Sequence, residues 1–113
     1  MARVEIELGA HLWNADLTGA NLRYASLDCA DLHNASLHKA NLYAANLRKA
    51  NLGAAAFNEA ELTNAGFEGA NLCQAYMVGA SLRYADLRDA DLTGVKFPEG
   101  YGKLPKKEKE NHG

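Results

Sequence analysis

Residues 21–42 read NLRYASLDCADLHNASLHKANL, and this stretch repeats every five residues. Two of the five positions in each repeat hardly vary. A leucine recurs at every fifth position: Leu22, Leu27, Leu32, Leu37 and Leu42. An alanine stands two places before each leucine: Ala20, Ala25, Ala30, Ala35 and Ala40. A period of five matches neither the 3.6-residue turn of an α-helix nor the two-residue alternation of a β-strand. The stretch therefore indicates a repeat architecture with short units.

The same register runs through most of the chain. Alanine recurs from Ala10 to Ala90 and gives way to Val95. The large apolar position changes from leucine in a few units: Phe57, Phe67, Met77 and Phe97. The residue between the two is usually Asn, Asp or Ser, with departures at Ala56, Glu61, Gly66 and Tyr76. The last two positions of each unit vary freely.

This pattern predicts a narrow solenoid. An inward Ala, an outward polar residue and an inward Leu form a short extended run. The next two residues must turn a corner, and residues such as Asn34 and Gly69 suit tight turns there. Four corners close a square coil of about twenty residues, and coils stack at roughly 4.8 Å. Alanine is required because four inward side chains meet near the axis beside four leucines.

The motif A-(N/D)-L-x-x, as in ANLRY at 20–24, ADLHN at 30–34 and ADLRD at 85–89, resembles the pentapeptide-repeat family. The resemblance covers residues 10–97. It implies an all-β fold, a right-handed quadrilateral parallel β-helix of about four and a half coils. Because the repeat is scaffold, it predicts the fold far better than the function.

The two ends depart from the repeat. Residues 1–9 contain RVEIEL, which alternates polar and apolar residues out of register and predicts a capping strand. Residues 98–113 begin with Pro98, which ends ladder hydrogen bonding, and Tyr101 and Leu104 are expected to fold back over the last coil. From Lys106 the chain reads as a charged, flexible tail. Phe97 and this segment either cap the rod or stack end to end on a second copy, which leaves a homodimer open.

Composition narrows the class of protein. The 113 residues carry a formal net charge of −2, which argues against direct nucleic-acid binding. Cys29 and Cys73 are well separated and read as reduced thiols. There is no long apolar run for a membrane span, and MARVEIELGA lacks the apolar core of a signal peptide. These features predict a cytoplasmic location and no membrane partner.

No enzyme signature is present. The sequence has no phosphate-binding glycine loop, nucleophile elbow or zinc-type histidine pair. His33 and Cys73 share a column but lie two coils apart, on the order of 10 Å, too far to ligate one ion. A convex rod also lacks the concave pocket of most active sites. We therefore predict no catalytic residues, no cofactor and no metal.

Residues twenty apart stack on one face, so the surface can be read by columns. One face carries the columns Arg23, Tyr43, Thr63, Arg83 and Tyr24, Ala44, Asn64, Tyr84, and we call it the Arg/Tyr face. Tyr and Arg are enriched at binding hot spots. The candidate partner-binding residues are Arg23, Tyr24, Tyr43, Arg83 and Tyr84. The same face can instead stack nucleic-acid bases, or be only a tyrosine ladder copied by duplication.

Two functions follow. The first is a non-enzymatic protein–protein interaction module whose rigid faces dock an unidentified protein. The second comes from the resemblance alone, since some pentapeptide-repeat proteins are DNA-mimicking inhibitors or protectors of type II topoisomerases such as DNA gyrase. Those have strongly acidic surfaces. Here the column Asp28, Arg48, Glu68 and Arg88 alternates in sign, which favours structural pairing.

Overall fold

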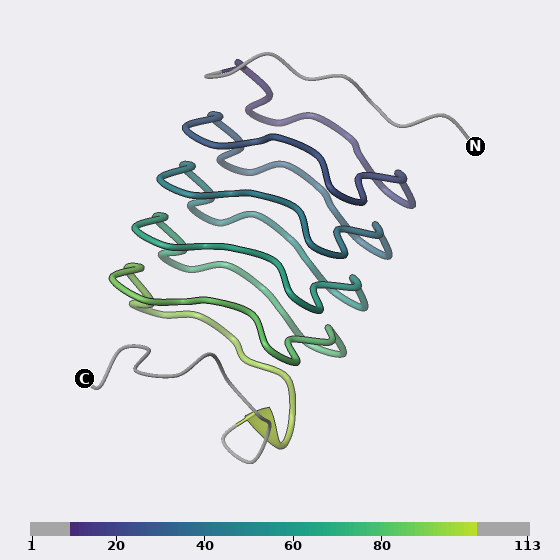
Figure 1. Ribbon diagram of the computed structural model, residues 1–113, viewed down its shortest axis with the longest axis vertical. Coiled ribbons are helices and arrows are strands. Elements are labelled where there is room, and N and C mark those ends of the chain that lie inside the picture. The colour runs from purple at the N-terminus through teal and green to yellow at the C-terminus, as the bar shows by residue number, and fades with distance from the viewer. Residues whose placement is uncertain (1–9, 102–113) are drawn as a thin grey trace.

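The computed structural model describes residues 10–101, which form a right-handed quadrilateral β-helix (Figure 1). The extended residues pair singly, in parallel bridges that always join positions twenty apart, from His11 with Asp31 to Tyr76 with Lys96. The predicted twenty-residue coil is therefore confirmed. Residues 10–101 make about four and a half such coils.

Each unit is bonded to both neighbouring coils. The N–H of Asn41 donates to the carbonyl of Ala20 in the preceding coil at 2.9 Å, and the N–H of Leu42 donates to Glu61 in the following coil at 2.8 Å. The same pair of bonds recurs from unit to unit along all four walls. Stability is therefore shared between adjacent coils, as expected for a solenoid.

The corners are tight turns with a fixed backbone conformation. The N–H of Ala45 donates to the carbonyl of Leu42 at 2.9 Å, which closes a four-residue turn. The second corner residue has a positive φ in unit after unit, whether it is glycine (Gly69, 70°) or not (Ala44, 57°). Positive φ at the third position of a turn is the mark of type II geometry. It explains the Asn and Gly residues found there.

The polar residue beside each leucine has a structural task. The backbone N–H of Arg48 donates to Oδ1 of Asn46 at 3.0 Å, and Thr93 bonds Asp91 in the same way at 3.1 Å. This is an Asx turn. The first corner N–H faces no carbonyl of the adjacent coils in these units, so Asn or Asp supplies the acceptor that a backbone N–H needs.

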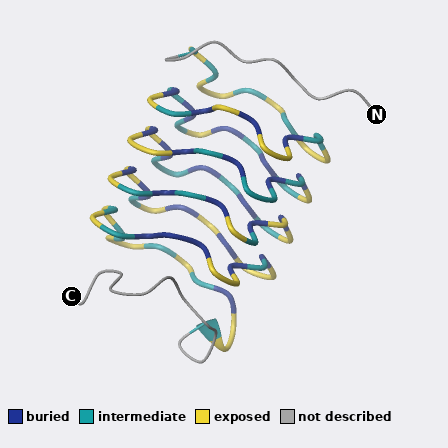
Figure 2. Cartoon of the chain, viewed as in Figure 1, coloured by how far each residue is buried: buried dark blue, intermediate teal, exposed yellow. Residues whose placement is uncertain are grey.

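Alanine and leucine fill the interior, and Figure 2 shows buried residues recurring along every coil. The inward side chains from Leu22 to Leu87 are almost completely excluded from solvent. At the ends the burial is partial, as for Leu12, Leu92 and Phe97. Phe97 stacks on Tyr101, with ring centroids 4.5 Å apart and planes 13° from parallel. Tyr101 thus packs against the last coil.

The predicted capping strand at 1–9 lies outside the described residues. So do Leu104 and the Lys/Glu-rich tail. Within residues 10–101 there is no helix long and apolar enough to cross a membrane.

Candidate functional site

The Arg/Tyr face consists of the units 20–24, 40–44, 60–64 and 80–84, which stack through bridges such as Asn41 with Glu61. Sequence spacing placed all five candidate residues on this face. The side chains of Arg23, Tyr24, Arg83 and Tyr84 are exposed, and Tyr43 is half-buried. The structure divides them into two clusters.

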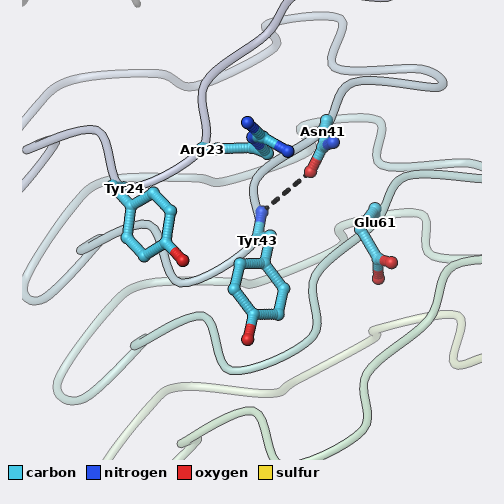
Figure 3. Close-up of a pocket in the computed structure, with 5 residues that line it drawn as sticks. All are labelled: Arg23, Tyr24, Asn41, Tyr43 and Glu61. Carbon is cyan, nitrogen blue, oxygen red and sulfur yellow. Dashed lines mark hydrogen bonds between the residues drawn. The ribbon is translucent and has the colours of Figure 1, made fainter.

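The first cluster lines a pocket. Arg23, Tyr24 and Tyr43 border an open hollow of about 320 Å³, together with Asn41 and Glu61 (Figure 3). The rings of Tyr24 and Tyr43 meet edge to face, with centroids 5.7 Å apart and planes at 80°. Tyr24 is 57% exposed, so it forms a wall of the hollow that is open to a ligand.

Hydrogen bonds fix the other walls of the pocket. The N–H of Tyr43 donates to Oδ1 of Asn41 at 3.1 Å, and the Tyr43 hydroxyl accepts from Nδ2 of Asn64 at 3.2 Å. The hydroxyl of Thr63 donates to Oε1 of Glu61 at 2.7 Å. Tyr43, Asn41 and Glu61 are thus oriented before any ligand arrives, which lowers the ordering entropy that binding costs.

Arg23 differs from the other arginines of the described range. Arg48 pairs with Glu68 at 3.2 Å, Arg88 pairs with Asp86 at 2.7 Å, and the guanidinium of Arg83 lies 5.7 Å from the ring centre of Tyr84. Among residues 10–101, the Arg23 guanidinium has neither an ion pair nor a ring beneath it. A charged, exposed and unpaired guanidinium is suited to an anionic group of a ligand.

The second cluster is Arg83 with Tyr84. It lies three coils from Arg23 and Tyr24, or about 14 Å at the strand spacing. Thr63 and Ser81 occupy the space between, with their hydroxyl oxygens 3.1 Å apart. The five candidate residues therefore share a face without forming one contiguous cluster.

Sequence reasoning did not name Asn41 or Glu61 as site residues: it took Asn41 as a regular repeat position and Glu61 as a mild departure from the repeat. A signal was available in the column Asn21, Asn41, Glu61 and Ser81. Glu61 is the acidic member of this column and departs from the Asn/Asp/Ser pattern. It shares the face with Tyr24 and Tyr43.

The next face carries the column Asp28, Arg48, Glu68 and Arg88, whose alternating signs predict ion pairs between adjacent coils. The structure contains only part of this pattern. Arg48 bonds Glu68 in the following coil, with Nε 3.2 Å from Oε1. Arg88 instead forms two hydrogen bonds to Asp86 of its own unit, at 2.8 and 2.7 Å. Arg48 and Arg88 of this column are thus each paired with a nearby carboxylate.

A third face holds Trp13 over His33. Their rings are stacked, with centroids 6.2 Å apart and planes at 15°. Nδ1 of His33 lies 2.7 Å from Oδ1 of Asp31. This hydrogen bond lowers the pKa of the Asp31 carboxyl below its usual value. Within the described part of the chain, no group of three or more His, Cys, Asp or Glu side chains is placed to hold a metal ion.

Comparison with known proteins agrees with this geometry. The family profile described as "Pentapeptide repeats" matches residues 9–38, 40–77 and 60–97, in 8 copies. The chain belongs to the pentapeptide repeat family. This confirms the family predicted from the A-(N/D)-L-x-x motif. Among curated proteins, none matches the chain.

Solved structures of pentapeptide repeat proteins resemble the chain. One, from the thylakoid lumen of Arabidopsis thaliana, is 33% identical with a TM-score of 0.62, over 73% of this chain and 61% of its own. HetL of the cyanobacterium Nostoc, involved in regulation of heterocyst differentiation, is 29% identical with a TM-score of 0.38, over 80% and 61%. QnrB1, a plasmid-mediated fluoroquinolone resistance protein, is 18% identical with a TM-score of 0.37, over 81% and 66%. The chain thus spans less than two thirds of the length of these proteins.

Proposed function

We propose that this pentapeptide repeat protein is a non-enzymatic interaction module that docks a protein partner on its Arg/Tyr face. The observation that carries the proposal is the pocket at Tyr43, where hydrogen-bonded walls surround the unpaired guanidinium of Arg23. Tyrosine and arginine contribute disproportionately to protein interfaces. The rigid backbone keeps them in the binding arrangement without a partner.

Mimicry of DNA toward a type II topoisomerase has less support. A DNA mimic needs accumulated negative charge, whereas Arg48 and Arg88 neutralise Glu68 and Asp86 on the face beside the Arg/Tyr face. Arg23 and Arg83 add positive charge to the Arg/Tyr face itself. The likeness to QnrB1 is too low to carry an argument about function.

A cytoplasmic site of action belongs to the same proposal. Its support is that Cys29 and Cys73 are both free thiols, as expected in a reducing compartment. Immunolocalisation of the native protein would test it, and an oxidising compartment would contradict it.

The test is affinity capture from native lysate with three baits. The first is the wild-type chain. The second carries Tyr24→Asn, Tyr43→Ser and Tyr84→Asn, where Asn is chosen because Tyr24 and Tyr84 both have φ of 61° and Asn tolerates that conformation. The third is Tyr76→Ser, because Tyr76 is a similarly exposed tyrosine (47%) on another face.

A partner held by wild type and by Tyr76→Ser but released by the triple variant supports docking on the Arg/Tyr face. Circular dichroism of each bait checks that the fold is kept. Equal recovery by all three baits would exclude the face as the docking surface.

A further inference from the structure

We propose that the pocket of the Arg/Tyr face binds a proline-rich segment of a partner protein in the polyproline II conformation. An acidic side chain of the segment contacts Arg23, and a basic side chain three residues away contacts Glu61. The inference rests on the proposed function and specifies the ligand that the same face recognises.

Three polar groups lie on three successive coils of the pocket. Bridges stack Asn41 on Asn21 and Glu61 on Asn41, and the Arg23 side chain extends toward Asn41 in Figure 3. The Arg23 guanidinium is unpaired among the described residues. Oδ1 of Asn41 accepts from the Tyr43 N–H, which leaves its Nδ2 group as the donor for a ligand. Oε1 of Glu61 is held by Thr63, and its second oxygen remains as an acceptor.

The ligand must therefore offer an anion, a carbonyl oxygen and a cation in a row. The charges at the ends are opposite, so a uniformly charged ligand such as a nucleic-acid strand would be attracted at one end and repelled at the other. The edge-to-face arrangement of Tyr24 and Tyr43, at 80°, also presents no parallel pair of platforms for stacked bases. A peptide with both charges meets each group with its complement.

The coil spacing selects the conformation of that peptide. The backbone of Glu61 lies two coils beyond that of Arg23, or about 9.6 Å along the axis, and the peptide side chains that contact the two charged groups should leave their own backbone at a similar separation. In polyproline II, three residues advance about 9.3 Å and bring the side chain back to the same side. A β-strand places residues three apart on opposite sides. An α-helix covers the distance only after about seven residues, with its carbonyls bonded internally and unavailable to Asn41.

The tyrosines suit proline rings. Polyproline II segments dock in grooves lined by aromatic side chains, and their carbonyls carry no internal hydrogen bonds. Tyr24 and Tyr43 form two walls at nearly a right angle, and the ring of Tyr43 is anchored through its hydroxyl by Asn64. The pocket volume of about 320 Å³ accommodates the part of a peptide that lies between the two charged groups.

The test is fluorescence polarisation of the full chain with labelled peptides. The probes are PPEPPRPP and its reverse PPRPPEPP, in which the charges are three residues apart, and PPEPRPPP and PPEPPPRP, in which they are not. We expect saturable binding of one three-residue probe, at least tenfold tighter than either spacing control. Glu61→Gln keeps the acceptor for Thr63 but removes the charge, and it should weaken that probe at least tenfold, as should Arg23→Gln.

Matched controls are Arg48→Gln and Glu59→Gln, which lie on other faces, and both should leave the affinity unchanged. A charge exchange completes the design, because Glu61→Lys should bind PPEPPEPP better than PPEPPRPP. The proposal is overturned if neither three-residue probe binds, if the spacing controls bind equally, if Glu61→Gln has no effect, or if labelled oligothymidylate binds the pocket in their place.

The experiments distinguish rejection of the polyproline II ligand from rejection of docking on the Arg/Tyr face. A partner released by the triple tyrosine variant, together with peptides that do not bind, rejects the polyproline II ligand and keeps the docking face. Equal capture by all baits rejects the docking face itself.

Discussion

The rings of Phe57 and Phe67 meet edge to face inside the solenoid, with centroids 5.9 Å apart and planes at 89°. Both side chains are completely buried. Ten residues are half of a twenty-residue coil, so the two phenylalanines come from opposite walls. The pair fills the interior at a position where the two preceding coils place Leu17 with Leu27 and Leu37 with Leu47.

The pair should be energetically coupled. We expect Phe57→Leu and Phe67→Leu each to destabilise the chain by about 1 kcal/mol, because leucine occupies this position elsewhere in the repeat. A double-mutant cycle should give a coupling of about 0.5–1.5 kcal/mol, the usual value for an edge-to-face aromatic pair. Urea unfolding of the four proteins measures it. Strictly additive single changes would show that the two rings contribute only through their burial.

The Asx hydrogen bond should contribute measurably at each corner. Asn46→Ala removes the acceptor of the Arg48 N–H, which now lies 3.0 Å from Oδ1. The group is exposed and water can replace the bond, so we expect a loss of about 0.5–1.5 kcal/mol in the free energy of unfolding. Asn46→Asp is the matched control, since it keeps the oxygen and should cost much less. Equal losses in the two variants would refute this role for the polar register.

The sequence was sufficient to predict the coil because the five-residue period repeats without interruption from Ala10 to Ala90. A side chain that recurs every twenty residues must stack, and this places Arg23, Tyr43 and Arg83 on one face without coordinates. Periodicity does not tell which neighbours bond. Arg88 bonds Asp86 of its own unit, and Arg23 pairs with no carboxylate among the described residues.

The pocket could not be predicted from the sequence for a related reason. Asn41 and Glu61 occupy the register that satisfies corner N–H groups, so their types are explained by folding alone. Only the three-dimensional arrangement shows that Glu61 faces the same hollow as Arg23 and the two tyrosines. Glu61 thus accepts the hydrogen bonds of Thr63 with Oε1 and can still present Oε2 to a ligand.

Positive φ at the corners predicts stabilising glycine substitutions. Ala54 has φ of 56°, where an L-residue costs about 1–2 kcal/mol and glycine does not. Glycine loses about 0.5–1 kcal/mol more conformational entropy on folding. Ala54→Gly should therefore stabilise the chain by about 0.5–1 kcal/mol, measured as a higher urea midpoint.

The neighbouring residue provides the control for this substitution. Ala55 is completely buried and is not among the positive-φ residues. Ala55→Gly removes an inward methyl group and adds freedom to the unfolded chain, so it should lower stability by about 1 kcal/mol or more. The same sign for both variants would mean that corner strain is relieved elsewhere in the coil.

Acid should destabilise the solenoid through the aspartates of the Asx register. A hydrogen bond from Thr18 lowers the pKa of Asp16, and one from Thr93, whose hydroxyl lies 2.8 Å from Oδ1, lowers the pKa of Asp91. Their folded-state pKa lies below the ordinary value of 3.8, so the unfolded chain takes up protons first as the pH falls. The stabilisation is complete above that value and is lost as the pH drops through the folded-state pKa.

The variant Asp16→Asn/Asp91→Asn isolates this effect, because asparagine keeps the acceptor oxygen but does not titrate. Urea midpoints measured from about pH 7 to about pH 3 should fall less steeply for the variant than for wild type at the acid end. NMR titration of the carboxyl carbons should place both pKa values below 3.8. If the urea midpoints of the two proteins fall equally steeply at acid pH, other carboxylates control the loss of stability. The threonine hydrogen bonds to Asp16 and Asp91 would then be equally strong when the carboxyl is protonated.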